Sequence, residues 1–342
     1  TLVVSDQIST SDRMVDLLPD ELIPNSLEGC EYPNHSVNID DNGTPMDTSD
    51  DVQYGINDIR VSHLLNMQSG LDVDPPETDV DERMTRDWHY EYDWVDDDSF
   101  YQGKNNPCID DETVAEEYDD GWDAPVKIET TIRETLRLPL NYQPGTSHNY
   151  SNIGYTILGE IIEEQSGMEY EGYVLEYVLA PMGIDNMQLG KTLFEHRAEN
   201  EVTYYSRTNK TFYSYFPLNH GITGATVPDF GSSDAMPKPY GGHTPMKELA
   251  ASGGWISNAA SYARFISHLD GALSHPNFND SFNFSIINPY DSVGSAYGNG
   301  VFHGSNDQNW SHTGALDGTS TRFARSLVGG ESVVIVLMIN NR

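Results

Sequence analysis

Apolar residues recur at helical spacing through much of the chain. Between residues 156 and 165, Ile157, Leu158, Ile161 and Ile162 form one stripe, which predicts an amphipathic helix. The same spacing predicts further helices at residues 59–71, 130–136, 170–179 and 259–269. Apolar runs of strand length appear near the end of the chain, at residues 310–313, 320–327 and 332–340.

The last two of these runs are separated by Gly329-Gly330, which predicts a hairpin turn. Residues 332–340 are apolar almost throughout, which is typical of a strand covered on both faces. We therefore expect the chain to end in an antiparallel pair of strands whose last member is buried on both sides.

Tyr150 and Asn152 stand on the connection that leads into the helix at 156–165, just after a turn at 143–146. A side chain at such an entrance can be held rigidly and still face a cleft. The alternative is an ordinary capping turn, because Asn and Ser are favoured helix starters. The stretch alone leaves both interpretations open.

The chain is strongly acidic, with 54 Asp and Glu against 18 Lys and Arg and a formal net charge of -36. Such a field repels nucleic acid, which excludes it as a partner. No run of about 18 apolar residues is present, so no membrane span is predicted. Acidic and aromatic residues fill 72–126, which is either a folded lid or a disordered insertion. No EF-hand spacing occurs, and neither a metal nor a cofactor is predicted.

The two cysteines, Cys30 and Cys108, are too few for a zinc ribbon, which leaves a disulfide or two buried thiols. Asn-X-Ser/Thr sequons are frequent and favour a secreted glycoprotein with the disulfide formed. Asn149 and Asn309 adjoin candidate site motifs, so we expect both to carry no glycan. The remaining sequons, at which glycosylation is predicted, are Asn34, Asn42, Asn209, Asn279 and Asn283.

Five short motifs follow one another along the chain. They are the helix at 59–71, Pro144-Gly145-Thr146 with Tyr150-Ser151-Asn152, Pro181-Met182-Gly183, the stretch 251–257, and His312-Thr313-Gly314. In this order they resemble the serine β-lactamase and penicillin-binding-protein superfamily, in its class C β-lactamase and esterase-like branch.

The resemblance implies an α+β fold, in which an antiparallel sheet flanked by helices joins a mostly helical subdomain. One β-lactamase/transpeptidase-like domain would cover 1–342, apparently cut at both ends relative to the family. Within it, 1–56 would follow the nucleophile helix, 57–290 would form the helical and loop subdomain with the acidic insertion 72–126, and 291–342 would supply the last strands.

The resemblance also implies roles for individual residues. Tyr150 would be the general base that takes the proton of the nucleophile, and Asn152 would bind the amide or carbonyl of the substrate. His312, Thr313 and Gly314 would line the cleft in place of the family's Lys-Thr-Gly. The backbone N–H of Ala315 would form half of an oxyanion hole. Because the pKa of tyrosine is ordinarily about 10, this role needs a nearby cation.

The family's Ser-X-X-Lys nucleophile motif does not occur in the sequence. The one serine or threonine that stands three positions before a lysine is Thr244, before Lys247, and it lies out of the family's order. The motif is expected upstream of residue 1. A fragment of an enzyme, a processed chain that pairs with another, and a relative that has lost catalysis all remain open.

The function that follows is acyl transfer on an ester or amide, with no hydrolysis by the chain as written. A mostly neutral His312 and the charge of -36 both disfavour anionic substrates, so neutral esters or amides are expected. The alternative is a secreted, non-catalytic structural or binding glycoprotein. Expected partners are a small ester or amide, and either a second chain that completes the sheet or a homo-oligomer.

Overall fold

The computed structural model describes part of the chain. Its described residues are 7–23, 38–40, 52–71, 128–136, 140–191, 196–204, 211–212, 236–237, 246–247, 249–269, 296–304, 309–316 and 318–340. The acidic stretch, both cysteines and the five predicted glycan sites lie outside them, so the predictions made there stay predictions. Among the helices that are described, none is long and apolar enough to cross a membrane.

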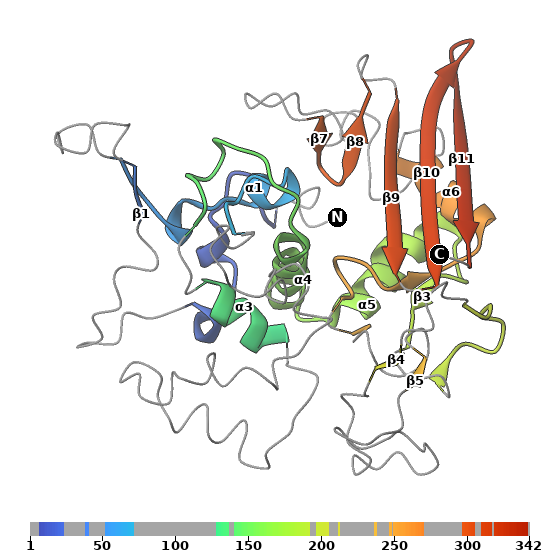
Figure 1. Cartoon of the computed structure of the whole chain (residues 1–342), viewed down its shortest axis with the longest axis horizontal. Coiled ribbons are helices and arrows are strands. Elements are labelled where there is room, and N and C mark those ends of the chain that lie inside the picture. The colour runs from blue at the N-terminus through green and yellow to red at the C-terminus, as the bar shows by residue number, and fades with distance from the viewer. Residues whose placement is uncertain are drawn as a thin grey trace.

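Among the described residues, most helices lie between positions 14 and 182, and one more helix precedes the main sheet. The α-helices are α1 (Val61–Leu65), α3 (Ile128–Leu136), α4 (Asn152–Ser166), α5 (Tyr170–Tyr173) and α6 (Ala259–Leu269). Shorter 3-10 or π turns are η1 (Met14–Asp16), η2 (Asp20–Leu22), η3 (Ile56–Asp58), η6 (Val174–Leu179) and η7 (Ala180–Met182). In Figure 1, α4 stands between α1 and α3 on one side and the sheet on the other.

The main sheet is antiparallel, with five strands in the order β11-β10-β9-β8-β7. Its strands are β7 (Tyr297–Gly298), β8 (Val301–His303), β9 (Trp310–Leu316), β10 (Thr319–Val328) and β11 (Glu331–Ile339). Three small pairs complete the described strands, namely β1 (Asn38–Asp40) with β2 (Val52–Tyr54), β3 (Gln188–Leu189) with β6 (Trp255–Ile256), and β4 (Thr211–Phe212) with β5 (Met236–Pro237). The predicted mixture of helices and an antiparallel sheet is confirmed.

The helical side and the sheet side of the molecule each have an apolar core of their own. On the helical side, Ile157 and Ile161 of α4 pack with Leu64 of α1 and with residues of α3, as the helical stripe predicts. On the sheet side, Ile266 of α6 packs against the face of the sheet that carries Phe323. A further cluster, made by η6, η7 and the residues after them, consists of Leu179, Met182, Ile184 and Met187.

The helix predicted at 156–165 begins earlier than its apolar stripe suggests. It spans Asn152–Ser166, because the extended Ser151 accepts a hydrogen bond from the backbone N–H of Gly154 at 3.1 Å and so caps it. Gly167 ends the helix in the left-handed conformation, at φ 67°. The shift makes Asn152 the first residue of the helix rather than part of the connection.

The prediction that the last strand is covered on both faces is wrong. In β11, Val334 and Val336 pack into the core beneath α6, whereas Ile335 and Leu337 are 65% and 54% exposed. Among the described residues, β11 is also the edge strand of its sheet. A continuous apolar run cannot distinguish such a strand from a fully buried one, since both lack polar alternation.

Replacing Gly159 with alanine is expected to destabilise the fold by about 1–3 kcal/mol, because overpacking forces neighbours apart. A Cβ on Gly159 would lie 2.6 Å from the Cβ of Ala251, which packs against α4. Gly172 is the matched control, since a Cβ there would meet nothing within 4 Å. Gly172→Ala is expected to stabilise the protein by up to about 1 kcal/mol through helix propensity. Urea unfolding measures both, and equal effects would contradict the packing argument.

Candidate active site

The stretch before α4 is fixed to the loop that follows α1. The backbone N–H of Asn149 donates to the carbonyl of Met67 at 3.0 Å, and that of Gly145 donates to the carbonyl of Gln68 at 2.9 Å. The N–H of Ser151 lies 2.9 Å from the Sδ of Met67. These bonds on either side of Tyr150 hold its backbone, so its side chain is presented from a rigid support rather than from a loose loop.

The turn between β7 and β8 joins the sheet to the helical side. Asn299 and Gly300 both have positive φ, 46° and 89°, as a tight hairpin of two residues requires. The N–H of Asn299 donates to Oδ1 of Asn66 at 3.0 Å. A Cβ on Gly300 would lie 3.3 Å from the hydroxyl of Tyr155, which itself donates to the carbonyl of Leu65 at 2.9 Å. The sheet edge is thus docked on α1 and α4.

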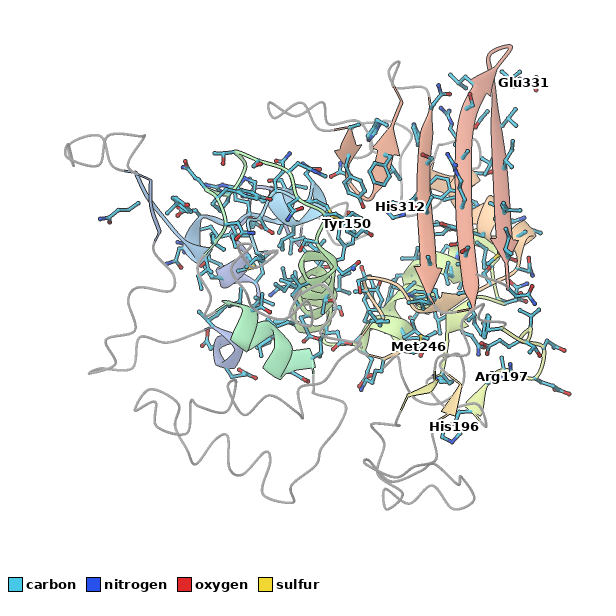
Figure 2. All side chains as sticks on the ribbon, viewed as in Figure 1. Tyr150, His196, Arg197, Met246, His312 and Glu331 are labelled. Atoms are coloured by element: carbon cyan, nitrogen blue, oxygen red, sulfur yellow. The ribbon has the colours of Figure 1, made fainter. Side chains whose placement is uncertain are left out.

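This docking brings Tyr150 and His312 together across the interface. Their ring centroids are 6.2 Å apart, and Figure 2 shows the two residues facing each other between α4 and β9. Tyr297 of β7 completes the group, with its ring 6.1 Å from Tyr150 and 5.7 Å from His312. His148 packs on Tyr297 at 5.8 Å, and Phe302 packs on His312 at 5.5 Å. Two residues predicted from sequence therefore share one aromatic cluster.

His312 is half-buried, and burial lowers its pKa below the ordinary value of histidine, against a smaller opposite effect of the Thr313 carbonyl. Its Nδ1 lies 2.7 Å from the carbonyl oxygen of Thr313, and its Nε2 lies 3.3 Å from the hydroxyl of Tyr297. Burial therefore favours the neutral imidazole over the charged form. We expected less positive charge at this position than a lysine would carry, and the lowered pKa of His312 agrees with that expectation.

Two other phenols near the cleft are held in the protonated form. Burial raises the pKa of Tyr155 well above its ordinary value, and the neighbouring Tyr297 raises it further. Burial likewise raises the pKa of Tyr297, against an opposite effect of its hydrogen bond with Tyr155, and the nearby Tyr150 raises this pKa further. Both hydroxyls therefore stay protonated at neutral pH and can donate hydrogen bonds. The role of Tyr150 as a base stays a prediction.

The other predicted site residues lie on the two elements that frame the cluster. Asn152 is half-buried at the first position of α4, and Thr313, Gly314 and Ala315 follow His312 along β9 as exposed residues. Gly314 lies opposite Thr321 of β10, whose hydroxyl would be 2.8 Å from a Cβ on Gly314. The oxyanion-hole role of Ala315 stays a prediction.

The cation that Tyr150 would need stays a prediction, and the two described lysines each pair with a glutamate. Lys191 pairs with Glu171 at 3.9 Å, and Lys247 pairs with Glu169 at 3.9 Å. The second pair is almost fully exposed. Within the residues that the structure describes, no cluster of His, Cys, Asp and Glu could hold a metal ion.

Sequence reasoning missed Tyr297 and Phe302, which complete the cluster. The signal that could have found them is Asn299-Gly300, a strong hairpin dipeptide flanked by Tyr297 and Phe302. Short strands of two or three residues give too little alternation to be recognised on their own.

The family profile for Beta-lactamase matches residues 3–342. The chain belongs to the Beta-lactamase family and has its serine-hydrolase-like fold. A segment of 54 residues is 41% identical to an Escherichia coli K12 protein named "Putative D-alanyl-D-alanine carboxypeptidase", and it covers 16% of this chain and 12% of that protein. The corresponding Salmonella paratyphi B protein is 42% identical over 55 residues, or 16% of this chain and 13% of its own length. The chain thus matches only a small part of these relatives.

Solved structures agree over nearly the whole chain. A D-stereospecific amidohydrolase from Streptomyces has a TM-score of 0.55 at 17% identity, covering 99% of this chain and 77% of its own. The octameric penicillin-binding protein homologue from Pyrococcus abyssi has a TM-score of 0.57 at 16% identity, covering 99% and 58%. The penicillin-binding protein from Bacillus halodurans has a TM-score of 0.54 at 15% identity, and the match covers 99% of this chain and 75% of that protein's chain. At these identities the likeness shows the fold.

Proposed function

We propose that the chain forms the base and acyl-binding side of an acyl-transfer cleft that acts on neutral amides or esters. The observation that carries the proposal is the approach of Tyr150 to His312 across the docked interface, at 6.2 Å between ring centroids. In this cleft Tyr150 takes the proton of an attacking serine hydroxyl and returns it to the leaving group. Asn152 binds the acyl side, and the N–H of Ala315 stabilises the developing oxyanion.

Amides and esters are favoured over β-lactam carboxylates for electrostatic reasons. The neutral His312 offers no fixed cation to a substrate carboxylate, and the net charge of -36 repels anions. The Streptomyces structure is named as an amidohydrolase, and the Ochrobactrum anthropi structure, at a TM-score of 0.53, as a D-amino acid amidase. These names support an amide as the first substrate to test.

The proposal requires a nucleophilic serine in a Ser-X-X-Lys motif. This motif does not occur in the 342 residues. We infer that acylation depends on a serine outside them, and that the chain by itself is inactive. The alternative function is a secreted, non-catalytic binding glycoprotein, which the missing motif and the sequons favour. A homo-oligomer remains part of the proposal, supported by the octameric assembly named for the Pyrococcus relative.

The test uses the natural protein that carries this sequence. We expect a higher kcat/KM for a neutral peptide amide or short-chain ester than for benzylpenicillin. A serine-reactive fluorophosphonate probe, followed by peptide mapping, should place the adduct on a serine outside the 342 residues. Preference for penicillin would contradict the substrate class, and an adduct within the 342 residues would contradict the assignment of the nucleophile. If the protein showed no turnover and formed no adduct, the result would favour the binding alternative.

A further inference from the structure

The two ring nitrogens of His312 have partners of different kinds. Nδ1 lies 2.7 Å from the carbonyl oxygen of Thr313, which can only accept a hydrogen bond. Nδ1 must therefore carry the proton in this contact. In a neutral imidazole the other nitrogen, Nε2, is then an acceptor, and the hydroxyl of Tyr297 lies 3.3 Å from it.

The hydroxyl of Tyr297 is suited to be the donor. Its environment is largely buried, which raises its pKa and keeps the phenol protonated. Tyr155, its buried neighbour, directs its own hydroxyl proton to the carbonyl of Leu65 at 2.9 Å. The hydroxyls of Tyr155 and Tyr297 also share a side-chain hydrogen bond, which lowers the pKa of Tyr297 and raises that of Tyr155. These directions fit Tyr155 as the donor in that pair, so the proton of Tyr297 can be directed at the lone pair on Nε2 of His312.

We propose that Tyr297 is a positioning residue that holds His312 as the neutral Nδ1–H tautomer, so that the β9 wall of the cleft presents neither a cation nor an open ring nitrogen to a ligand. This deepens the proposed function and rests on it for the ligand class, which becomes neutral acyl compounds. The tautomer itself follows from the two contacts of His312 and needs no catalytic assumption.

Among the described residues, the ring contacts of His312 favour its neutral form. Phe302 of β8 offers an apolar ring, and the described titratable groups whose rings contact the imidazole are the phenols of Tyr150 and Tyr297. His148 faces Tyr297 from the stretch before α4. Protonation in acid would place a second proton on Nε2, end its role as acceptor and put a positive charge on the cleft wall. Carboxylate ligands should therefore gain access only on the acid side of this titration.

The experiment is a pH titration of the 342-residue chain labelled with 15N-histidine, read by long-range 1H–15N NMR. The His312 signals are assigned by their loss in His312→Gln. We expect the Nδ1–H tautomer at neutral pH. In Tyr297→Phe the pKa of His312 should rise, because a hydrogen bond that stabilised the neutral form is lost. In the matched control Tyr155→Phe it should not rise, since Tyr297 can still donate to Nε2.

An Nε2–H tautomer in the unmodified chain would overturn the inference, as would an unchanged or lowered His312 pKa in Tyr297→Phe. If Tyr297→Phe does not fold, the inference is still tested by the tautomer of His312 in the unmodified chain. Because the titration requires no turnover, it separates this inference from the proposed function. A chain that hydrolyses nothing can confirm the role of Tyr297, and an active one can refute it.

Discussion

Tyr150→Phe is expected to lower kcat by about 10²–10⁴-fold in the natural protein that carries this sequence, the usual contribution of a positioned general base. Phenylalanine keeps the ring that packs 6.1 Å from Tyr297 and 6.2 Å from His312, so the cleft keeps its shape. The change removes only the hydroxyl. Steady-state hydrolysis of a neutral ester, with unfolding curves recorded in parallel, measures the effect.

Tyr204→Phe is the matched control for this experiment. The hydroxyl of Tyr204 donates to Glu201 at 2.7 Å in a half-buried setting outside the cleft. Its loss should leave kcat and KM unchanged. If Tyr150→Phe retained full activity with an intact fold, Tyr150 would not be the base. An increase in KM with kcat unchanged would instead assign it to uniform substrate binding.

The helices of the fold could be predicted well where periodicity and capping agree. Residues 259–269 show both an apolar stripe and a clear start, and α6 spans those residues. The apolar stripe predicts the start of α4 four residues too late, because the first turn of this helix is set by the cap at Ser151 rather than by apolar spacing. Capping is a contact of one side chain, which periodicity does not report.

The candidate site could be predicted only in part, because its assembly is a tertiary event. Tyr150 and His312 are 162 positions apart, and nothing local in either stretch indicates that they meet. The order of motifs in the family supplied that expectation. Tyr297 entered the cluster through the docking of Asn299 onto Asn66, a contact between a turn and a loop that no sequence pattern encodes.

Phe323→Ala is expected to destabilise the protein by about 3–5 kcal/mol, the usual cost of emptying a buried aromatic site. Phe323 is 3% exposed and packs edge-on against Tyr262 of α6, at 5.8 Å between centroids. It also lies directly opposite His312 in the register of β10 and β9. A total stability of about 5–15 kcal/mol is typical of proteins, so the change should remove a large share of it.

The matched control is Ile335→Thr, in the neighbouring strand of the same sheet. Ile335 is 65% exposed, and threonine keeps the β-branched shape that strands favour, so a change within about 0.5 kcal/mol is expected. Urea unfolding with an unchanged m value gives both free energies. Because Phe323 supports the strand that carries His312, Phe323→Ala should also disturb the NMR signals of His312, whereas Ile335→Thr should not. Equal losses at the two positions would mean that the core under α6 does not hold β9 in place.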